Sequence, residues 1–414
     1  MPQSDRTEQP RRTGERLLRL LRVWEVLLAS LQLGTTSFGG PIAHLGYFER
    51  AYVRQRGWLS GEQYGSVVAL CQLLPGPASS QVNFLVGLQR AGWTGALAAW
   101  IGFTLPSAVL MFACARWTAS VQGPGPFGQA IVHGLKLAAV AVVAQAVWSM
   151  AGRFCRDRAT VAIAVVAALV LLLAGGAASQ LIVLAAGAVA GAVLCRAAVL
   201  DASAPSLAVR PATAWGALAL YLLLLIGLPI VAAFYPGSLV ALSAIFYRAG
   251  ALVFGGGHVV LPLLRDALVP GGWISDDRFL TGYGLAQALP GPLFTLAAYL
   301  GGASDAVHAP GAGAAVALVS IFLPGLLACV AGVALWGRLA RRARARASLA
   351  GINAAVVGIL AAALYDPVWK TSVRSGFDVI VALVGVLLLQ RWKAPPVAVV
   401  AACVVLSGAR ALTA

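Results

Sequence analysis

Two apolar phrases interrupted by Pro-Gly-Pro carry the residues best suited to chemistry. They read QLLPGP at 72–77 and QALPGP at 287–292. Proline removes a backbone donor and costs roughly 3 kcal/mol or more inside a helix, so each phrase predicts a broken helix. The helix that starts after such a break presents free backbone amides and the positive end of its dipole, which together bind anions. The phrases therefore predict a binding site for a small anion.

The predicted binding residues at these breaks are the motif residues and the first residues of the helices that follow. They are Gln72, Pro75, Gly76, Pro77, Ala78, Ser79 and Ser80 in the first half, and Gln287, Pro290, Gly291, Pro292 and Thr295 in the second. The serines and the threonine would add hydroxyl donors to the amides. Both motifs could instead be kinks in packed helices, but two of them, each preceded by glutamine, favour a binding site.

Paired glycines predict a second pair of breaks. Gly39-Gly40 and Gly255-Gly256 stand at the ends of apolar segments, at matching positions in the two halves of the chain. Glycine permits unwound backbone and a close approach to a ligand, so these four residues join the predicted site. The alternative is tight packing between membrane helices, where glycine is also common.

Two cations lie inside apolar segments. Lys136 and Arg248 each stand about ten residues into such a segment, near the midplane of a membrane helix that rises ~1.5 Å per residue. A charge there costs roughly 2.5–3.5 kcal/mol, so both are predicted to bind the anion, with a snorkelling or structurally paired cation as the alternative. Of the fourteen acidic residues only Glu25 and Glu62 could lie within the hydrocarbon, so no deep carboxylate is expected to relay protons.

No cofactor or metal site is expected. The six cysteines are scattered and include no C-x-x-C, a spacing that excludes a disulfide framework or a zinc site. The lone histidines His44 and His133 are weak candidates, because a single histidine is more often structural.

The elements that position these residues are predicted to be membrane helices. The chain is 60% hydrophobic and 11% charged, its mean hydropathy is +0.85, and many runs approach the roughly 20 apolar residues that span a bilayer. The net charge of +16 comes largely from arginines in short loops between apolar runs, a pattern that sets membrane topology. The expected partner is therefore the lipid bilayer and not nucleic acid. The polar N-terminal tail has no signal-peptide cleavage site and is expected to stay in the cytoplasm.

The two halves of the chain repeat each other. Five pairs of phrases match in the same order: SFGGP 37–41 with VFGGG 253–257, RGWLS 56–60 with GGWIS 271–275, QLLPGP with QALPGP, TLPS 104–107 with FLPG 322–325, and HGLKLAAVAVV 133–143 with AGINAAVVGIL 350–360. The predicted organisation is a tail at 1–19, a first repeat at 20–197, a connector plus one odd span at 198–237 and a second repeat at 238–414.

Charge distribution predicts the topology. Lys and Arg concentrate on one side if each Pro-Gly-Pro segment, 61–90 and 278–302, crosses the membrane once. That choice predicts an all-α polytopic protein of about thirteen spans, with a cytoplasmic N-terminus and the second repeat inverted relative to the first. Arg50, Arg54 and Arg56 would then lie outside, so an amphipathic helix along the membrane surface is expected there.

These motifs closely resemble those of the chromate ion transporter family in its long, two-repeat form. The resemblance covers about 24–197 and 238–410. The family's phrases fall on Phe38, Gly39, Gly40, Pro41, Trp58, Pro75, Gly76 and Pro77, and again on Phe254, Gly255, Gly256, Trp273, Pro290, Gly291 and Pro292. Gly257 stands where the first half has Pro41, so that loop is expected to differ in shape between the halves.

The resemblance implies export of chromate from the cytoplasm across the inner membrane and hence chromate resistance. Inverted repeats with broken helices imply alternating access around a midplane site. Transport of another oxyanion, such as sulfate or molybdate, is the nearest rival. A membrane-bound chromate reductase would need redox-cofactor ligands that the sequence lacks, and a passive anion channel is a third class. The expected protein is therefore a transporter, not an enzyme, in which a homodimer is possible.

Overall fold

The computed structural model contains helices and no strands in the residues that it describes, which are 8–120, 126–174, 176–195, 207, 209–339 and 342–413. Residues 1–7 of the predicted tail, the last two residues of the predicted first repeat (196–197), and 198–206 and 208 of the predicted connector lie outside them. Five helical segments are long and apolar enough to cross a membrane: 78–118, 128–154, 211–234, 310–335 and 343–372. Six shorter apolar helices accompany them. The prediction of an all-α polytopic membrane protein is confirmed for these residues, and the count of thirteen spans stays a prediction.

The elements of the two halves follow one order, with α8 (Pro211–Phe234) between them. The first half contains α1 (Glu8–Thr36), α2 (Gly40–Phe48), the π-helix η1 (Glu49–Gln55), α3 (Gly61–Leu73), α4 (Ala78–Ser120), α5 (Pro126–Phe154), α6 (Arg158–Ala174) and α7 (Gly176–Leu194). The second contains α9 (Leu239–Leu252), η2 (Gly257–Val259), α10 (Val260–Leu268), α11 (Asp276–Ala288), η3 (Leu293–Thr295), α12 (Leu296–Gly302), α13 (Pro310–Leu339), α14 (Ala343–Ala363), η4 (Leu364–Trp369), α15 (Lys370–Ser372), α16 (Gly376–Gln390) and α17 (Pro396–Thr413).

Matching serines start the two helices that lead into the Pro-Gly-Pro breaks. Ser60 Oγ accepts from the Gln63 amide at 3.2 Å, and Gln63 Oε1 accepts from the Ser60 amide at 2.9 Å, which forms a capping box at α3. Ser275 occupies the same place in the second repeat, and its side chain accepts from the Arg278 amide at the start of α11. The repeat in the sequence thus fixes where each of these helices begins.

Each Pro-Gly-Pro segment doubles back, so the prediction that it crosses the membrane once is wrong. In the second repeat the Asp305 amide donates to the Trp273 carbonyl at 2.9 Å, and Arg278 Nη2 donates to the Ala303 carbonyl at 2.6 Å. These bonds hold both ends of segment 278–302 together.

The first repeat doubles back in the same way. The guanidinium groups of Arg56 and Arg90 lie 5.8 and 5.3 Å from the centre of the same ring, that of Trp58. Segment 61–90 therefore starts and ends at one level, which we call the Trp58 end of the molecule. The corresponding level of the second repeat, at Trp273 and Ala303, is the Trp273 end.

The physical reason is that the motif forms a turn between two helices. Gly76 has φ +112° and Gly291 φ +96°, values that favour glycine, and the flanking prolines keep α3 and α4 from continuing into one helix. The glycine break after α1 also reverses the chain, because Tyr52 OH lies 3.2 Å from Ser30 Oγ. Each repeat therefore begins with two hairpins.

The expected amphipathic helix on the membrane surface is also wrong. The apolar residues Phe48 and Tyr52 of this segment are 0% and 1% exposed and pack in the core with Phe103. The η1 helix that carries Arg50 and Arg54 runs back toward the Trp58 end, where Arg56 lies beside Arg90. Arg90 itself pairs with Glu25 at 2.9 Å.

Two long helices connect the hairpins of the two repeats. After a kink at Gly92 (φ +68°), α4 passes the breaks, where Ser107 Oγ lies 2.7 Å from Thr295 Oγ1. It then reaches the second hairpins, where Thr118 Oγ1 lies 3.1 Å from Tyr299 OH. In the second repeat α13 runs the other way, from the Trp273 end past the breaks to α3. The hairpins of the two repeats therefore approach the breaks from opposite ends.

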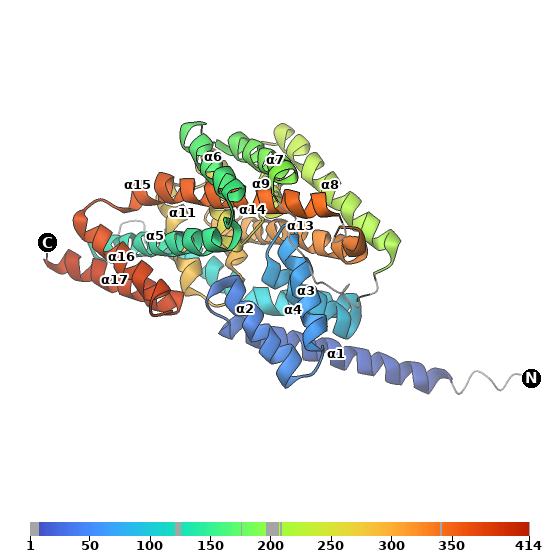
Figure 1. Ribbon diagram of the computed structural model, residues 1–414. Helices are drawn as coiled ribbons and strands as arrows, with labels where there is room; N and C mark the ends of the chain where they lie inside the picture. Colours follow the sequence, from blue (N-terminus) through green and yellow to red (C-terminus); the bar gives the residue numbers. More distant parts are fainter. Residues whose placement is uncertain are drawn as a thin grey trace, which may run out of the picture.

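The last two helices of each half pack on a helix of the other half (Figure 1). The α6–α7 pair packs on α14 of the second repeat, and the α16–α17 pair packs on α5 of the first. Glycines permit this close contact, since a Cβ at Gly358 would lie 2.2 Å from the Ala164 carbonyl and one at Gly385 would lie 2.7 Å from Ala141 Cβ. Figure 1 also shows the start of α1 and the end of α17 at opposite ends of the molecule.

Candidate functional site

The four predicted breaks meet in the middle of the molecule and are joined crosswise. The Gly76 amide donates to the Val253 carbonyl at 2.8 Å, and the Gly291 amide donates to the Ser37 carbonyl at 2.9 Å. Each Pro-Gly-Pro turn therefore pairs with the glycine break of the other repeat. Backbone groups freed by a break inside a membrane need partners within the protein, and these two bonds supply them.

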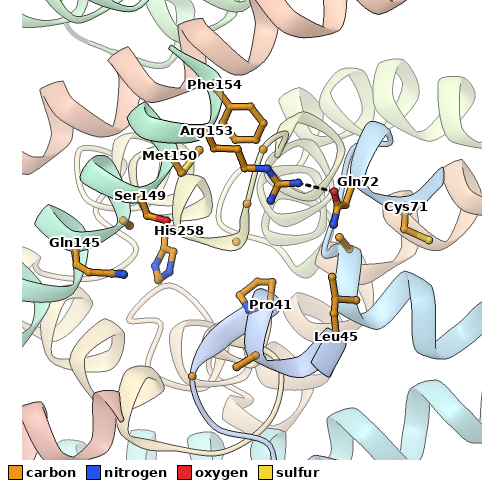
Figure 2. A pocket seen from close by; sticks show the side chains of 18 of the residues that line it. Pro41, Leu45, Cys71, Gln72, Gln145, Ser149, Met150, Arg153, Phe154 and His258 are labelled. Atoms are coloured by element: carbon orange, nitrogen blue, oxygen red, sulfur yellow. Dashed lines mark hydrogen bonds between the residues drawn. The ribbon is translucent and has the colours of Figure 1, made fainter. Parts of the chain in front are cut away.

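A cavity of about 410 Å³ lies beside these breaks (Figure 2). Its walls come from the end of α3, the start of α4, the last turns of α5 and the glycine breaks of both repeats. Six of the residues predicted from the sequence line it: Gly39, Gln72, Gly76, Ala78, Gly255 and Gly256. The cavity thus joins residues that lie in both halves of the sequence.

Arg153 supplies the positive charge of the cavity. It lies in the last turn of α5, and its Nη2 donates to Gln72 Oε1 at 2.5 Å across the cavity wall (Figure 2). Gln145, Ser149 and His258 add polar groups, and none of the described residues that line the cavity is Asp or Glu. Such a set of donors without a carboxylate suits an anion.

Unwound backbone forms another wall. Gly255 and Gly256 have φ +75° and +153°, so the chain between α9 and η2 is not helical and its amides are not used within a helix. A Cβ at Gly255 would lie 3.2 Å from both Asn353 Oδ1 and Met150 Cε. The backbone therefore approaches the cavity closely only because these residues are glycine.

The predicted hydroxyl donors lie away from the cavity. Ser79, Ser80 and Thr295 are 2%, 1% and 1% exposed, and none lines the cavity. Ser79 Oγ lies 3.4 Å from His44 Nδ1, and Thr295 Oγ1 donates to the Pro292 carbonyl at 2.8 Å. Two of the three hydroxyls thus have partners within the protein.

The four motif prolines shape the turns and do not line the large cavity. The Pro75 carbonyl accepts from Gln81 Nε2 at 2.8 Å, and the same amide reaches the Gly325 carbonyl at 2.8 Å. Pro77 packs near Gly325 as well. In the second repeat Pro290 and Pro292 flank Gly291 in the equivalent turn.

The two predicted cations are not brought together with the breaks. Lys136 is 2% exposed, and its Nζ pairs with Asp277 Oδ1 at 2.5 Å. Arg248 lines a different cavity, of about 450 Å³, between α8, α9 and α10 near Trp273. Both cations were predicted to bind the anion at the breaks, but neither lines the cavity that contains Arg153.

A second, much smaller cavity lies at the repeat-equivalent position. It measures about 20 Å³ and is lined by Gly40, Gln287 and Gly291, together with Gly39 and Leu289. Gln287 matches Gln72, Gly291 matches Gly76 and Leu289 matches Leu74 in the repeat. The cavity beside the first Pro-Gly-Pro turn is therefore large, and the equivalent cavity beside the second is almost filled by the protein.

Arg153 and His258 were not among the residues predicted from the sequence. Arg153 is closely followed by Arg156 and Arg158, a spacing typical of a loop between membrane helices. Extending the register that matches 133–143 with 350–360 pairs Arg153 with Lys370, so a cation recurs at this point of both repeats. That recurrence is the signal that could have identified it.

Comparison with known proteins gives a consistent result. A family model described as "Chromate transporter" matches the chain twice, at 24–192 and 240–408. The chromate transport protein of Pseudomonas aeruginosa is 30% identical over 370 residues, covering 88% of this chain and 86% of that protein. The probable chromate transport protein of Synechococcus elongatus is 28% identical over 382 residues, 88% of each chain. That of Cupriavidus metallidurans is 26% identical over 381 residues, 89% of this chain and 88% of the relative. No solved structure matches the chain.

Proposed function

The chain belongs to the chromate transporter family, whose members are transporters and not enzymes, and on that premise we propose that it exports chromate from the cytoplasm by alternating access. Export would confer chromate resistance on the cell. Sulfate and molybdate carry the same charge and shape, so transport of either is the alternative.

The observation that carries this proposal is the cavity with Arg153. Chromate is a tetrahedral dianion, and a guanidinium can donate two parallel hydrogen bonds to such an oxyanion. Gln72 already accepts from Arg153 at 2.5 Å, so an incoming oxyanion would replace the glutamine oxygen as acceptor. Gly255 and Gly256 line the same cavity beside Met150, and their amides would donate to the remaining oxygens.

The pair of unequal cavities supports alternating access. Hairpins of the two repeats approach the breaks from opposite ends, so inverted-topology repeats are part of the proposal. The cavity beside α3 measures about 410 Å³, and its counterpart beside α11 about 20 Å³. A state in which the second cavity is open and the first closed would expose the same central breaks to the other side.

The distribution of basic residues supports a proposed orientation of the protein in the membrane. Arg56 and Arg90 lie beside Trp58, Arg54 closely precedes them in η1, and Arg342, Arg344 and Arg346 follow α13, which packs on α3. Arg265 and Arg278 lie toward the Trp273 end, where they pair with Asp276 and Asp305. With the positive-inside rule, the basic residues at the Trp58 end support a cytoplasmic position of this end, and of the N-terminus, in a cell with this protein in its inner membrane. The large cavity would face the cytoplasm, as an exporter awaiting substrate requires.

Chromate uptake into inverted membrane vesicles tests the function. Energised vesicles with the wild-type protein are expected to accumulate radiolabelled chromate without forming chromium(III). Arg153→Gln should lower the initial rate about tenfold, because it removes a charge-assisted hydrogen bond worth ~1.5 kcal/mol. Arg156→Gln is the matched control, since that arginine does not line the cavity and should keep the wild-type rate.

Other outcomes would point elsewhere. Accumulation of sulfate or molybdate without chromate would support the alternative substrate. Uptake that survives in Arg153→Gln but is lost in Arg248→Ala would move the site to the cavity beside α8.

A further inference from the structure

The two repeat-equivalent cavities differ because their hairpins pack differently against the flanking helices. In the second repeat α11 packs on α5, and a Cβ at Gly284 would lie 2.6 Å from the Leu135 carbonyl. The equivalent pair in the first repeat is α3 with α14, and in the described chain α14 has no comparable packing with α3. The large cavity lies beside α3, where this packing is missing.

One ion pair spans the packed interface. Lys136 Nζ on α5 contacts Asp277 Oδ1 on α11 at 2.5 Å. The lysine side chain is 3% exposed, whereas that of Asp277 is 66% exposed, so the contact lies where the closed interface meets the surface of the protein. The neighbouring acid Asp276 pairs with Arg265 at 2.9 Å, whereas Asp277 pairs with the buried ammonium. Separation of α11 from α5 would take Asp277 away from the ammonium and lose their electrostatic attraction, so this pair opposes that separation.

The other repeat has no equivalent of this pair. The register of the repeat matches Lys136 with Asn353 and Asp277 with Glu62. Asparagine carries no charge, so closing α3 onto α14 would form no ion pair at this point. The two repeats therefore differ at this point in their residues as well as in their helix packing.

We propose that the Lys136–Asp277 ion pair locks the α11 hairpin against α5 and holds the cavity at the Trp273 end closed. Lys136 is then a positioning residue and not a ligand of the transported anion. The inference rests on the proposed function, because a lock affects transport only if the two cavities open in turn. Breaking the pair would favour the state that is open at the Trp273 end.

Thiol accessibility tests the lock without any substrate. Leu74 lines the open cavity and Leu289 the closed one, at equivalent points of the repeat, so Leu74→Cys and Leu289→Cys are matched reporters. Each is labelled with a membrane-impermeant maleimide from one face of the vesicle, and mass spectrometry of the peptides separates it from the native cysteines. Leu74→Cys should react from the Trp58 face, and Leu289→Cys should be protected from the Trp273 face.

Breaking the pair should reverse this pattern. Lys136→Ala or Asp277→Asn should raise the labelling rate of Leu289→Cys about fivefold to tenfold and lower that of Leu74→Cys. Exchange of the charges, Lys136→Asp with Asp277→Lys, should restore protection, which a purely structural role of either side chain would not do. Asp305→Asn is the control, because it breaks the Arg278–Asp305 pair within the same hairpin and leaves the α5 interface intact.

The proposal is overturned if Leu289→Cys stays protected in both single variants. It is also overturned if Asp305→Asn opens the cavity equally or if the exchanged pair leaves it open. Should Lys136→Ala fail to fold, Asp277→Asn and the exchanged pair decide the matter. Chromate uptake by the same vesicles separates the two proposals. If the variants alter the labelling but the wild-type protein takes up no chromate, only the proposed transport function is overturned. If the wild-type protein takes up chromate but the variants leave the labelling unchanged, only the proposed lock is overturned.

Discussion

At the scale of single residues, two glycines have no room for a side chain. Gly76 has φ +112°, and a Cβ there would lie 2.7 Å from the Gly325 Cα. Gly291 has φ +96°, and its Cβ would lie 3.0 Å from Ser107 Cβ. Both also donate the hydrogen bonds that join the repeats. Backbone conformation, crowding and hydrogen bonding therefore all require glycine at these turns.

Gly76→Ala should destabilise the protein by about 2–4 kcal/mol, because alanine is strained at positive φ and its methyl group meets backbone that cannot move aside. The matched control is Gly65→Ala in the middle of α3, where a Cβ meets nothing within 4 Å. That change should be neutral or stabilise by up to ~1 kcal/mol. The apparent melting temperature of the purified protein in detergent measures both. Equal melting temperatures for the two variants would contradict the account of Gly76.

Residue type and spacing predicted part of the site. The helix breaks at both motifs are confirmed, since α3 ends at Leu73 and α4 begins at Ala78. The sequence could not tell that Ser79 faces His44 and not the cavity, because a helix start presents side chains on every side. Nor could it find the partner of Lys136, since Asp277 is far away in the sequence. Binding by the remaining predicted residues stays a prediction.

At the scale of elements, the reversal at the glycine breaks was not predicted from the sequence. The count of about thirteen spans considered a reversal at the Pro-Gly-Pro segments but took α1 as a simple crossing. Because the glycine break reverses the chain as well, Arg54, Arg56 and Arg90 fall at the same end. The number of spans and their topology stay predictions.

Cysteine labelling distinguishes hairpins from crossings. Gly61→Cys and Thr94→Cys should both react from the cytoplasmic face, and His308→Cys should react from the opposite face, because Gly61 and Thr94 flank one hairpin and His308 follows the other. A Cβ at Gly61 meets nothing within 4 Å, so the substitution should not disturb folding. Reaction of Gly61→Cys from outside would instead support a single crossing by segment 61–90.

At the scale of the whole molecule, neither repeat is complete by itself. Its breaks are bonded to those of the other repeat, and its terminal helix pair packs on a helix of the other repeat. The α8 helix packs on α9 and α13, with Tyr221 OH donating to the Ala251 carbonyl at 3.0 Å, so it belongs structurally with the second half. The folding unit is therefore the complete chain.

Fragments divided between residues 200 and 201 should fold only together. Co-expressed, they are expected to copurify through a tag on one fragment and to restore chromate uptake to at least about half of the rate of the intact chain. Each fragment alone should give no uptake and little membrane-inserted protein, because its breaks would lack their crossed partners. Uptake by the first fragment alone would show that a single repeat suffices.

The crossed bonds at the centre join main-chain atoms only. An amide of glycine and a carbonyl of serine or valine make the same bond whatever side chain the carbonyl residue carries, and Ser37 and Val253 already differ. Side chains around this junction can therefore differ between the repeats without loss of the bonds that join them. Lys136 and Arg153 stand in the first repeat where the second has Asn353 and Lys370. If the proposed cycle operates, these differences would make its two opposite states unequal in stability while the junction stays the same.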